Sequence, residues 1–165
     1  ENRENAGGET DSEKAYTPQK DCLIDIQIDA HIPESYIYSV PHRLAMYRRI
    51  ADVRTNEDAM DVTDELIDRF GDPPKSVLGL IEVSLLRNTA AALGVYEIGQ
   101  RGDNLLLYWN NINMKAVTRL SSDMRGKILV SAGSKPYVSV KVDSGADTIK
   151  TLKSALMILT LGARS

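Results

Sequence analysis

The chain has 165 residues, 42% of them apolar and 26% charged, which is typical of a soluble globular protein with one core. Its formal net charge of -3 gives no general attraction for a nucleic-acid backbone or an anionic membrane. The single cysteine, Cys22, excludes an internal disulfide, and no run of about 20 apolar residues predicts a membrane span. We therefore expect a cytoplasmic protein.

The first 20 residues contain almost no side chain that a core could bury. They predict a polar tail or linker over residues 1–20, with one domain over residues 21–165. The chain also starts at Glu1 without an initiator methionine. We therefore expect it to be a piece of a longer protein.

The first predicted element is a half-buried strand from Cys22 to Ala30, in which apolar side chains occupy every second position. We expect this strand to end near Pro33, because proline lacks the N–H donor of a β-ladder.

Three helices are predicted next, over residues 42–54, from about residue 56 to 70, and over about residues 74–93. Thr55 or Asn56 can cap the second helix. The third helix is apolar on more than one side, which predicts that it packs against more than one neighbour. Between the second and third helices, Gly71 can adopt a left-handed conformation, Asp72 can act as a cap and Pro73 can occupy the first helical position. We assign these three residues a structural role.

The period returns to two after Gly94, where VYEIG and NLLLYW flank the turn sequence QRGDN. A second predicted hairpin consists of KILVSA and YVSVKVD around GSKP, and a last helix covers residues 146–161. Residues 113–121 fit neither period. One N-terminal strand, three consecutive helices, two β-hairpins and a closing C-terminal helix do not alternate as in a parallel sheet, so we predict an α+β fold.

The sequence offers little for catalysis. Cys22 shares a face with isoleucines, which favours a buried structural thiol over a nucleophile. His31 and His42 are the only histidines, and a metal site would need both of them with carboxylates. Because no phosphate-binding loop or hydrolase motif is present, we expect no catalytic residues, no cofactor and no metal.

Two charged surfaces remain as candidates. Arginines between Arg43 and Arg54 could contact phosphates, although a solvated helix face explains them more simply. Acidic residues on the second helix fall on one face, opposite its apolar side chains, and we predict that they bind a partner. These predicted partner-binding residues are Asp61, Asp64, Glu65 and Asp68.

Two strings, AHIPESYIYSVPHRLAMYRRI from Ala30 to Ile50 and ELIDRFG from Glu65 to Gly71, resemble the C-terminal domain of bacterial transcription-repair coupling factors. The match covers about residues 22–95. The resemblance implies a non-catalytic regulatory domain of an ATP-dependent DNA translocase. It implies docking on the N-terminal UvrB-like module of the same polypeptide, which restrains translocase activity and recruitment of the UvrA damage sensor. RNA polymerase would be reached only through the full-length factor.

Two other functions compete with this one. The first is a nucleic-acid-binding appendage that uses the helix from Arg43 to Arg54, and the second is a small enzyme built from aspartates, arginines and the two histidines. We rank them second and third, and we expect no direct contact with nucleic acid or a membrane.

Overall fold

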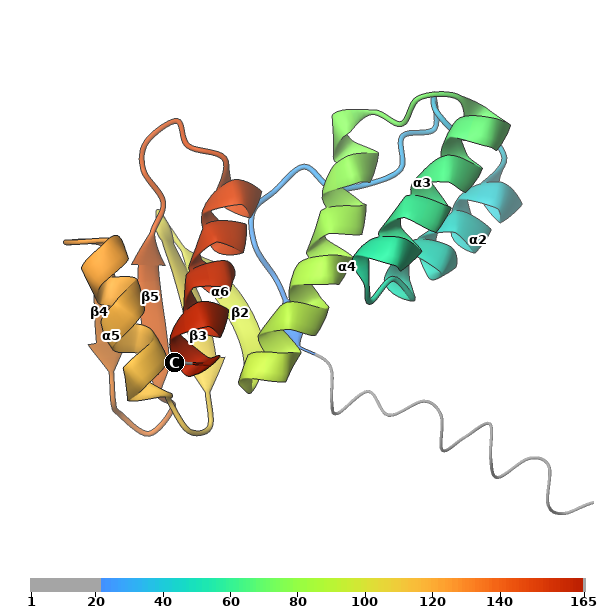
Figure 1. Cartoon of the computed structure of the whole chain (residues 1–165). Helices are drawn as coiled ribbons and strands as arrows, with labels where there is room; N and C mark the ends of the chain where they lie inside the picture. The colour runs from blue at the N-terminus through green and yellow to red at the C-terminus, as the bar shows by residue number, and fades with distance from the viewer. Residues whose placement is uncertain (1–21, 165) are drawn as a thin grey trace, which may run out of the picture.

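The computed structural model describes residues 22–164, which form a helical half and a sheet half joined by one long helix (Figure 1). The helical half contains α2 (Val40–Ala51), α3 (Asn56–Phe70) and the first part of α4 (Lys75–Leu93). The sheet half contains β1 (Leu23–Ile24), β2 (Val95–Arg101), β3 (Asn104–Trp109), α5 (Met114–Asp123), β4 (Ile128–Ser131), β5 (Tyr137–Lys141) and α6 (Thr148–Arg164). The predicted α+β class and order of elements are confirmed.

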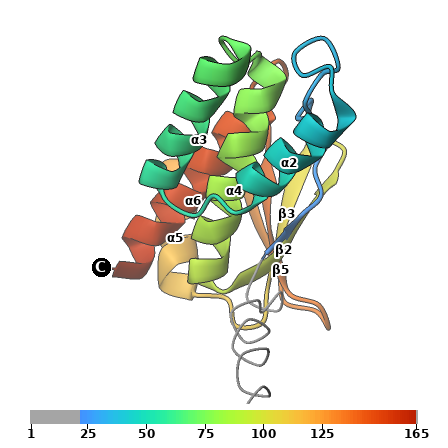
Figure 2. The ribbon, with the colours of Figure 1, turned by 90° about the vertical axis from the view of Figure 1, so that its right-hand side faces the viewer.

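The five strands form one sheet in the order β1-β2-β3-β5-β4, in which only the β1–β2 pair is parallel. Both predicted hairpins are present, and they pair with each other through β3 and β5. Helices α4, α5 and α6 lie on one side of this sheet (Figure 2), whereas α2 and α3 pack only in the helical half. Val138, Val140 and Val142 alternate inward as their spacing predicts. In this order β4 pairs only with β5, so β4 lies at an edge of the sheet.

The predicted N-terminal strand is hydrogen-bonded to the sheet over a much shorter segment than the one in which its side chains alternate. Side chains from Cys22 to Ala30 do alternate between the interior and solvent, but only Leu23 and Ile24 pair with β2. The backbone then leaves the sheet. The N–H of Gln27 accordingly donates to the side-chain oxygen of Gln100 (2.7 Å) and not to a main-chain carbonyl. The alternation of apolar and polar residues indicates which side chains are buried. In this segment the alternate burial continues beyond the last residue that pairs with β2.

The ends of the helices follow local hydrogen bonding. Thr55 caps α3 in a capping box, in which its hydroxyl accepts from the Asp58 N–H and the Asp58 carboxylate accepts from the Thr55 N–H. Gly94 ends α4 in the left-handed conformation. Asn113 caps α5 over the segment that fitted neither period, so a ten-residue helix forms there.

The junction after α3 bears out the prediction for Gly71 in part and corrects the predictions for Asp72 and Pro73. Gly71 does have a positive φ of 86°, but its ψ of -172° lies outside the left-handed helical region. Asp72 does not cap α4 and Pro73 is not its first residue, because Pro74 is the N-cap and makes no side-chain hydrogen bond. The reason is steric: a residue that precedes proline is disfavoured in the helical region, so Pro73 cannot start a helix before Pro74.

The buried side chains form two clusters instead of the single predicted core, and α4 contributes to both. Val77 and Ile81 belong to the helical-half cluster, whereas Leu86 and Ala90 belong to the sheet-half cluster. By length and composition alone, the 19-residue helix α4 is long and apolar enough to cross a membrane. Its packing on two sides accounts for this hydrophobicity.

Candidate protein-docking surface

Helix α3 presents a polar face away from the rest of the helical half. Val62 and Leu66 are buried against the core of that half. Asp61, Asp64 and Asp68 are exposed on the other side, and within residues 22–164 none of the three carboxylates forms an ion pair. The structure therefore contains the acidic face that the helical period predicts.

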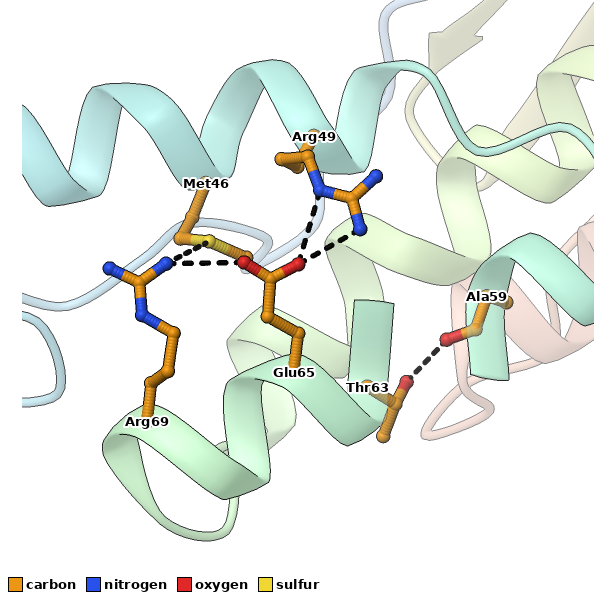
Figure 3. Close-up of polar contacts among 6 residues, drawn as sticks. All are labelled: Met46, Arg49, Ala59, Thr63, Glu65 and Arg69. Atoms are coloured by element: carbon orange, nitrogen blue, oxygen red, sulfur yellow. Dashed lines mark hydrogen bonds and ion pairs between the residues drawn. The ribbon is translucent and has the colours of Figure 1, made fainter. Parts of the chain in front are cut away.

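Glu65 differs from these aspartates because two arginines hold it inside the domain (Figure 3). Its Oε1 accepts hydrogen bonds from Nε (3.2 Å) and Nη2 (2.9 Å) of Arg49 on α2, and its Oε2 accepts from Nη1 of Arg69 (3.1 Å). Arg69 also lies 3.8 Å from the sulfur of Met46. The Arg49 hydrogen bonds, with help from Arg69, lower the pKa of the Glu65 carboxyl. Glu65 thus links α2 to α3.

This link changes what can be expected of Glu65. Both of its oxygens already have charged donors, so a partner's arginine would have to compete with Arg49 and Arg69. Replacing Glu65 by lysine would place three cations together, so we expect such a change to weaken the contact between α2 and α3. The sequence offers no local signal for the link, since Arg49 lies 16 residues away on another helix.

Exposed apolar side chains accompany the acidic face. Met60 is 65% exposed and Ile67 is 44% exposed, and with Asp64 they follow the four- and three-residue spacing of one stripe on α3. An open hollow of about 420 Å³ lies beside Met60, with Ala59, Thr63 and Asp64 in its lining. Exposed apolar side chains bordered by polar groups match the apolar centre and polar rim of protein interfaces.

The arginines of the rival nucleic-acid surface are largely engaged within the domain. Nη1 of Arg43 donates to the carbonyls of Ile37 (2.9 Å) and Tyr38 (3.0 Å). Arg49 is held by Glu65, and Arg48 is exposed. Because α2 ends at Ala51, Arg54 lies in the loop after it, and residues 43–54 do not offer their arginines as one row of phosphate ligands.

The residues considered for catalysis do not come together. Cys22 is 1% exposed, and burial raises the pKa of its thiol to about 12. Nδ1 of His31 lies 2.8 Å from Asp29, whereas the His42 ring lies beside Phe70 at a tilt of 55°, with ring centroids 6.2 Å apart. Among residues 22–164, no group of three or more His, Cys, Asp and Glu side chains could hold a metal ion.

Comparison with known proteins first identifies the fold. The crystal structure of the C-terminal domain of a transcription-repair coupling factor superposes with a TM-score of 0.74 at 18% identity, covering 90% of this chain and 96% of that one. The architecture is therefore that of this class of C-terminal domain.

Sequence comparison then identifies the family. The model of the TRCF domain matches residues 26–120, which is more than half of the chain. The transcription-repair-coupling factor of Bacillus subtilis is 31% identical over 127 residues, or 77% of this chain and 10% of that protein. The Mycobacterium bovis factor is 38% identical over 79 residues, or 48% of this chain and 6% of that protein. The chain belongs to the TRCF domain family and spans about a tenth of the length of such relatives.

Proposed function

We propose that this chain, with its domain over residues 21–165, is a non-catalytic regulatory interaction domain of a cytoplasmic transcription-repair coupling factor. It docks on the N-terminal UvrB-like module of the same polypeptide. Docking covers the surface that recruits the UvrA damage sensor and restrains the translocase. RNA polymerase is linked to this domain only through the full-length factor.

The acidic face of α3 supports this proposal. Asp61, Asp64 and Asp68 are exposed and have no intramolecular cation among the described residues, so a basic partner gains their full attraction. Met60 and Ile67 add apolar area beside them. Glu65 contributes to docking by fixing α3 against α2, and it reaches a partner only by releasing Arg49 or Arg69.

The docking should be reversible. Exposed ion pairs each contribute up to about 1 kcal/mol, so a few of them with two apolar anchors give a contact that a competing partner can open. Where a pair becomes fully desolvated on docking, removing one partner costs about 2 to 5 kcal/mol, much of it because the other charge is left buried and unpaired. A contact in this range suits a domain that restrains a factor and then releases it.

The test is a titration of the chain against the purified UvrB-like module at two salt concentrations. The variant carries Asp64→Lys and Asp68→Lys, two exposed changes that leave the Glu65 link in place. We expect its affinity to fall about tenfold or more at low salt, and the salt dependence of binding to fall with it. Circular dichroism checks that the variant is folded.

The matched control carries Asp25→Lys and Asp103→Lys, which make the same charge change at exposed positions of the sheet half. This control should bind as the parent does. Equal affinity for the parent and the folded α3 variant would show that the acidic face is only a solvated surface. Equal weakening by both variants would show that net charge, and not this face, controls binding.

A further inference from the structure

Strand β4 is the open edge of the sheet, at the end of the molecule opposite to α3 (Figure 1). It pairs with β5 on one side only. Proteins commonly protect such edges with charges, prolines or bulges, because an unpaired edge is a template for another strand. At four residues β4 is short, which is itself one protection of an edge, but Ile128, Leu129, Val130 and Ser131 include no charge and no proline and form no bulge.

The ladder shows which main-chain groups face outward. The N–H of Lys141 donates to the carbonyl of Lys127 (2.9 Å), which makes these two residues a hydrogen-bonded pair. In an antiparallel ladder such pairs alternate, so Leu129 and Ser131 are also bonded to β5. The N–H and C=O groups of Ile128 and Val130 therefore point away from the sheet. Two donors and two acceptors are available to one further strand.

A groove lined by apolar side chains together with small polar ones and Arg125 runs beside this edge, between β4 and α5. It has a volume of about 450 Å³, and its lining includes Met114, Val117, Ile128 and Val130. Met114 is 55% exposed and Val130 is 41% exposed. On the opposite face of β4, Leu129 is 73% exposed. An added strand would find apolar contacts for its side chains on both faces of the sheet.

The charge around the groove is positive, in contrast to the chain as a whole. Residues 114–127 contain four basic side chains and one acidic side chain. Arg119 pairs with Asp123 (3.9 Å), and Lys127 pairs with Asp143 (2.6 Å). Arg125 lines the groove, and neither it nor Lys115 has an ion-pair partner among residues 22–164. A ligand here gains most if it carries carboxylates.

We propose that the β4 edge binds an extended, acidic segment of a partner protein as a sixth strand. Its main chain bonds to the outward groups of Ile128 and Val130. Alternate apolar side chains enter the groove between β4 and α5, and a carboxylate meets Arg125. This is recognition by β-strand addition, in which main-chain hydrogen bonds give affinity and alternate side-chain pockets give specificity.

A second copy of this chain fits the edge less well. Two β4 edges in contact would bring together two copies of residues 114–127, each with an excess of positive charge. Such an approach is repelled, whereas an acidic segment is attracted. The partner surface on α3 has the opposite sign and lies at the other end of the domain, so this proposal does not depend on that docking site.

The test uses the 165-residue chain and a blocked, fluorescein-labelled octapeptide in which valine and threonine alternate before two terminal glutamates. The control peptide ends in two lysines. We expect saturable binding of the acidic peptide, weakened about fivefold or more by Arg125→Glu and by the lysine ending. In the complex, the amides of Ile128 and Val130 should exchange hydrogen more slowly, while those of Leu129 and Ser131 should be unchanged.

A proline at position 130 isolates the main-chain contribution. Val130→Pro removes a donor that β5 does not use, so the β4–β5 ladder stays intact while strand addition is blocked. Val130→Thr is the matched control, because it keeps the N–H and the branched shape. Peptide binding should be lost in the proline variant and kept in the threonine variant.

Three results would overturn the proposal. One is no binding of the acidic peptide to the folded parent. Another is binding that neither Arg125→Glu nor Val130→Pro alters, which would place the peptide elsewhere. The third is concentration-dependent dimerisation of the parent in sedimentation that Val130→Pro abolishes, which would assign the edge to a second copy. Should the proline variant fail to fold, Arg125→Glu and the exchange pattern decide.

Discussion

Two helical glycines should respond in opposite directions to the same substitution by alanine. Gly162 lies in α6 where this helix crosses α5, and a methyl group at Gly162 would lie 2.8 Å from the Cα of Ala116 and 3.2 Å from its carbonyl oxygen. The obstacle is backbone, so it cannot turn aside as a side chain does. Relieving the contact requires α5 and α6 to move apart by roughly half an ångström or more, which weakens the dispersion contacts along their interface.

The expected magnitude follows from two opposing terms. Adding a methyl group to a packed interface costs about 1 to 3 kcal/mol. Replacing glycine by alanine within a helix returns up to about 1 kcal/mol, and less here because Gly162 is two residues from the end of α6. We therefore expect Gly162→Ala to lower the free energy of unfolding by about 1 to 2 kcal/mol, or the Tm by about 2 to 8 °C.

Gly79 in α4 is the matched control. A methyl group there would lie 3.4 Å from Cδ1 of Ile149 and 3.6 Å from Cβ of Ala30, which are ordinary contacts. Only the helix-propensity term remains, so Gly79→Ala should raise the free energy of unfolding by about 0.5 to 1 kcal/mol. Urea titration followed by the fluorescence of Trp109 measures both variants. A Gly162→Ala variant as stable as Gly79→Ala would refute the close approach of α5 to α6.

Two further predictions concern ionisable groups. Because its ion pairs lower the pKa of Glu65, they stabilise the folded state fully above the ordinary value of 4.5 and progressively less as the pH falls through the lowered pKa. Glu65→Gln should therefore lower the free energy of unfolding by about 1 kcal/mol or less at pH 7. Thermal melts should show that this loss of stability disappears in acid. The same loss at both pH values would contradict the ion-pair explanation. Since burial raises the pKa of Cys22 to about 12, its thiol should resist a disulfide reagent at pH 8 in the native chain and react fully in urea. Rapid reaction of the native chain would show that the β1 segment opens.

Elements whose side chains repeat with a clear period could be predicted from the sequence. The three helices, both hairpins and the double-sided burial of α4 all follow from local pattern and turn chemistry. The start of α3 could also be predicted from the sequence, because Thr55 and Asp58 have the spacing of a capping box. What local pattern cannot supply is the pairing of β3 with β5, which joins strands about 30 residues apart in the sequence.

The candidate docking site divides in the same way. The exposure of Asp61, Asp64 and Asp68 follows from the period of α3, since they lie opposite Val62 and Leu66. The role of Glu65 does not follow from that period. The period places Glu65 at the edge of the acidic face, but it does not show that this edge faces α2, where Arg49 is within reach. Periodicity gives the angle of a side chain about its own helix and says nothing of the neighbour that it meets.

Helix α4 determines how the two proposed surfaces relate. Its first half is buried with α2 and α3, and its second half is buried with the sheet. Rotating the helical half against the sheet half must therefore bend the continuous helix α4, or expose Val77 and Ile81 or Leu86 and Ala90. Exposing a buried side chain of this kind costs about 1.5 to 3 kcal/mol, which exceeds what an exposed ion pair returns. The domain therefore moves as one body. A partner held at the acidic face of α3 consequently fixes the direction in which the basic β4 edge points, and opposite charges let each surface select a different partner.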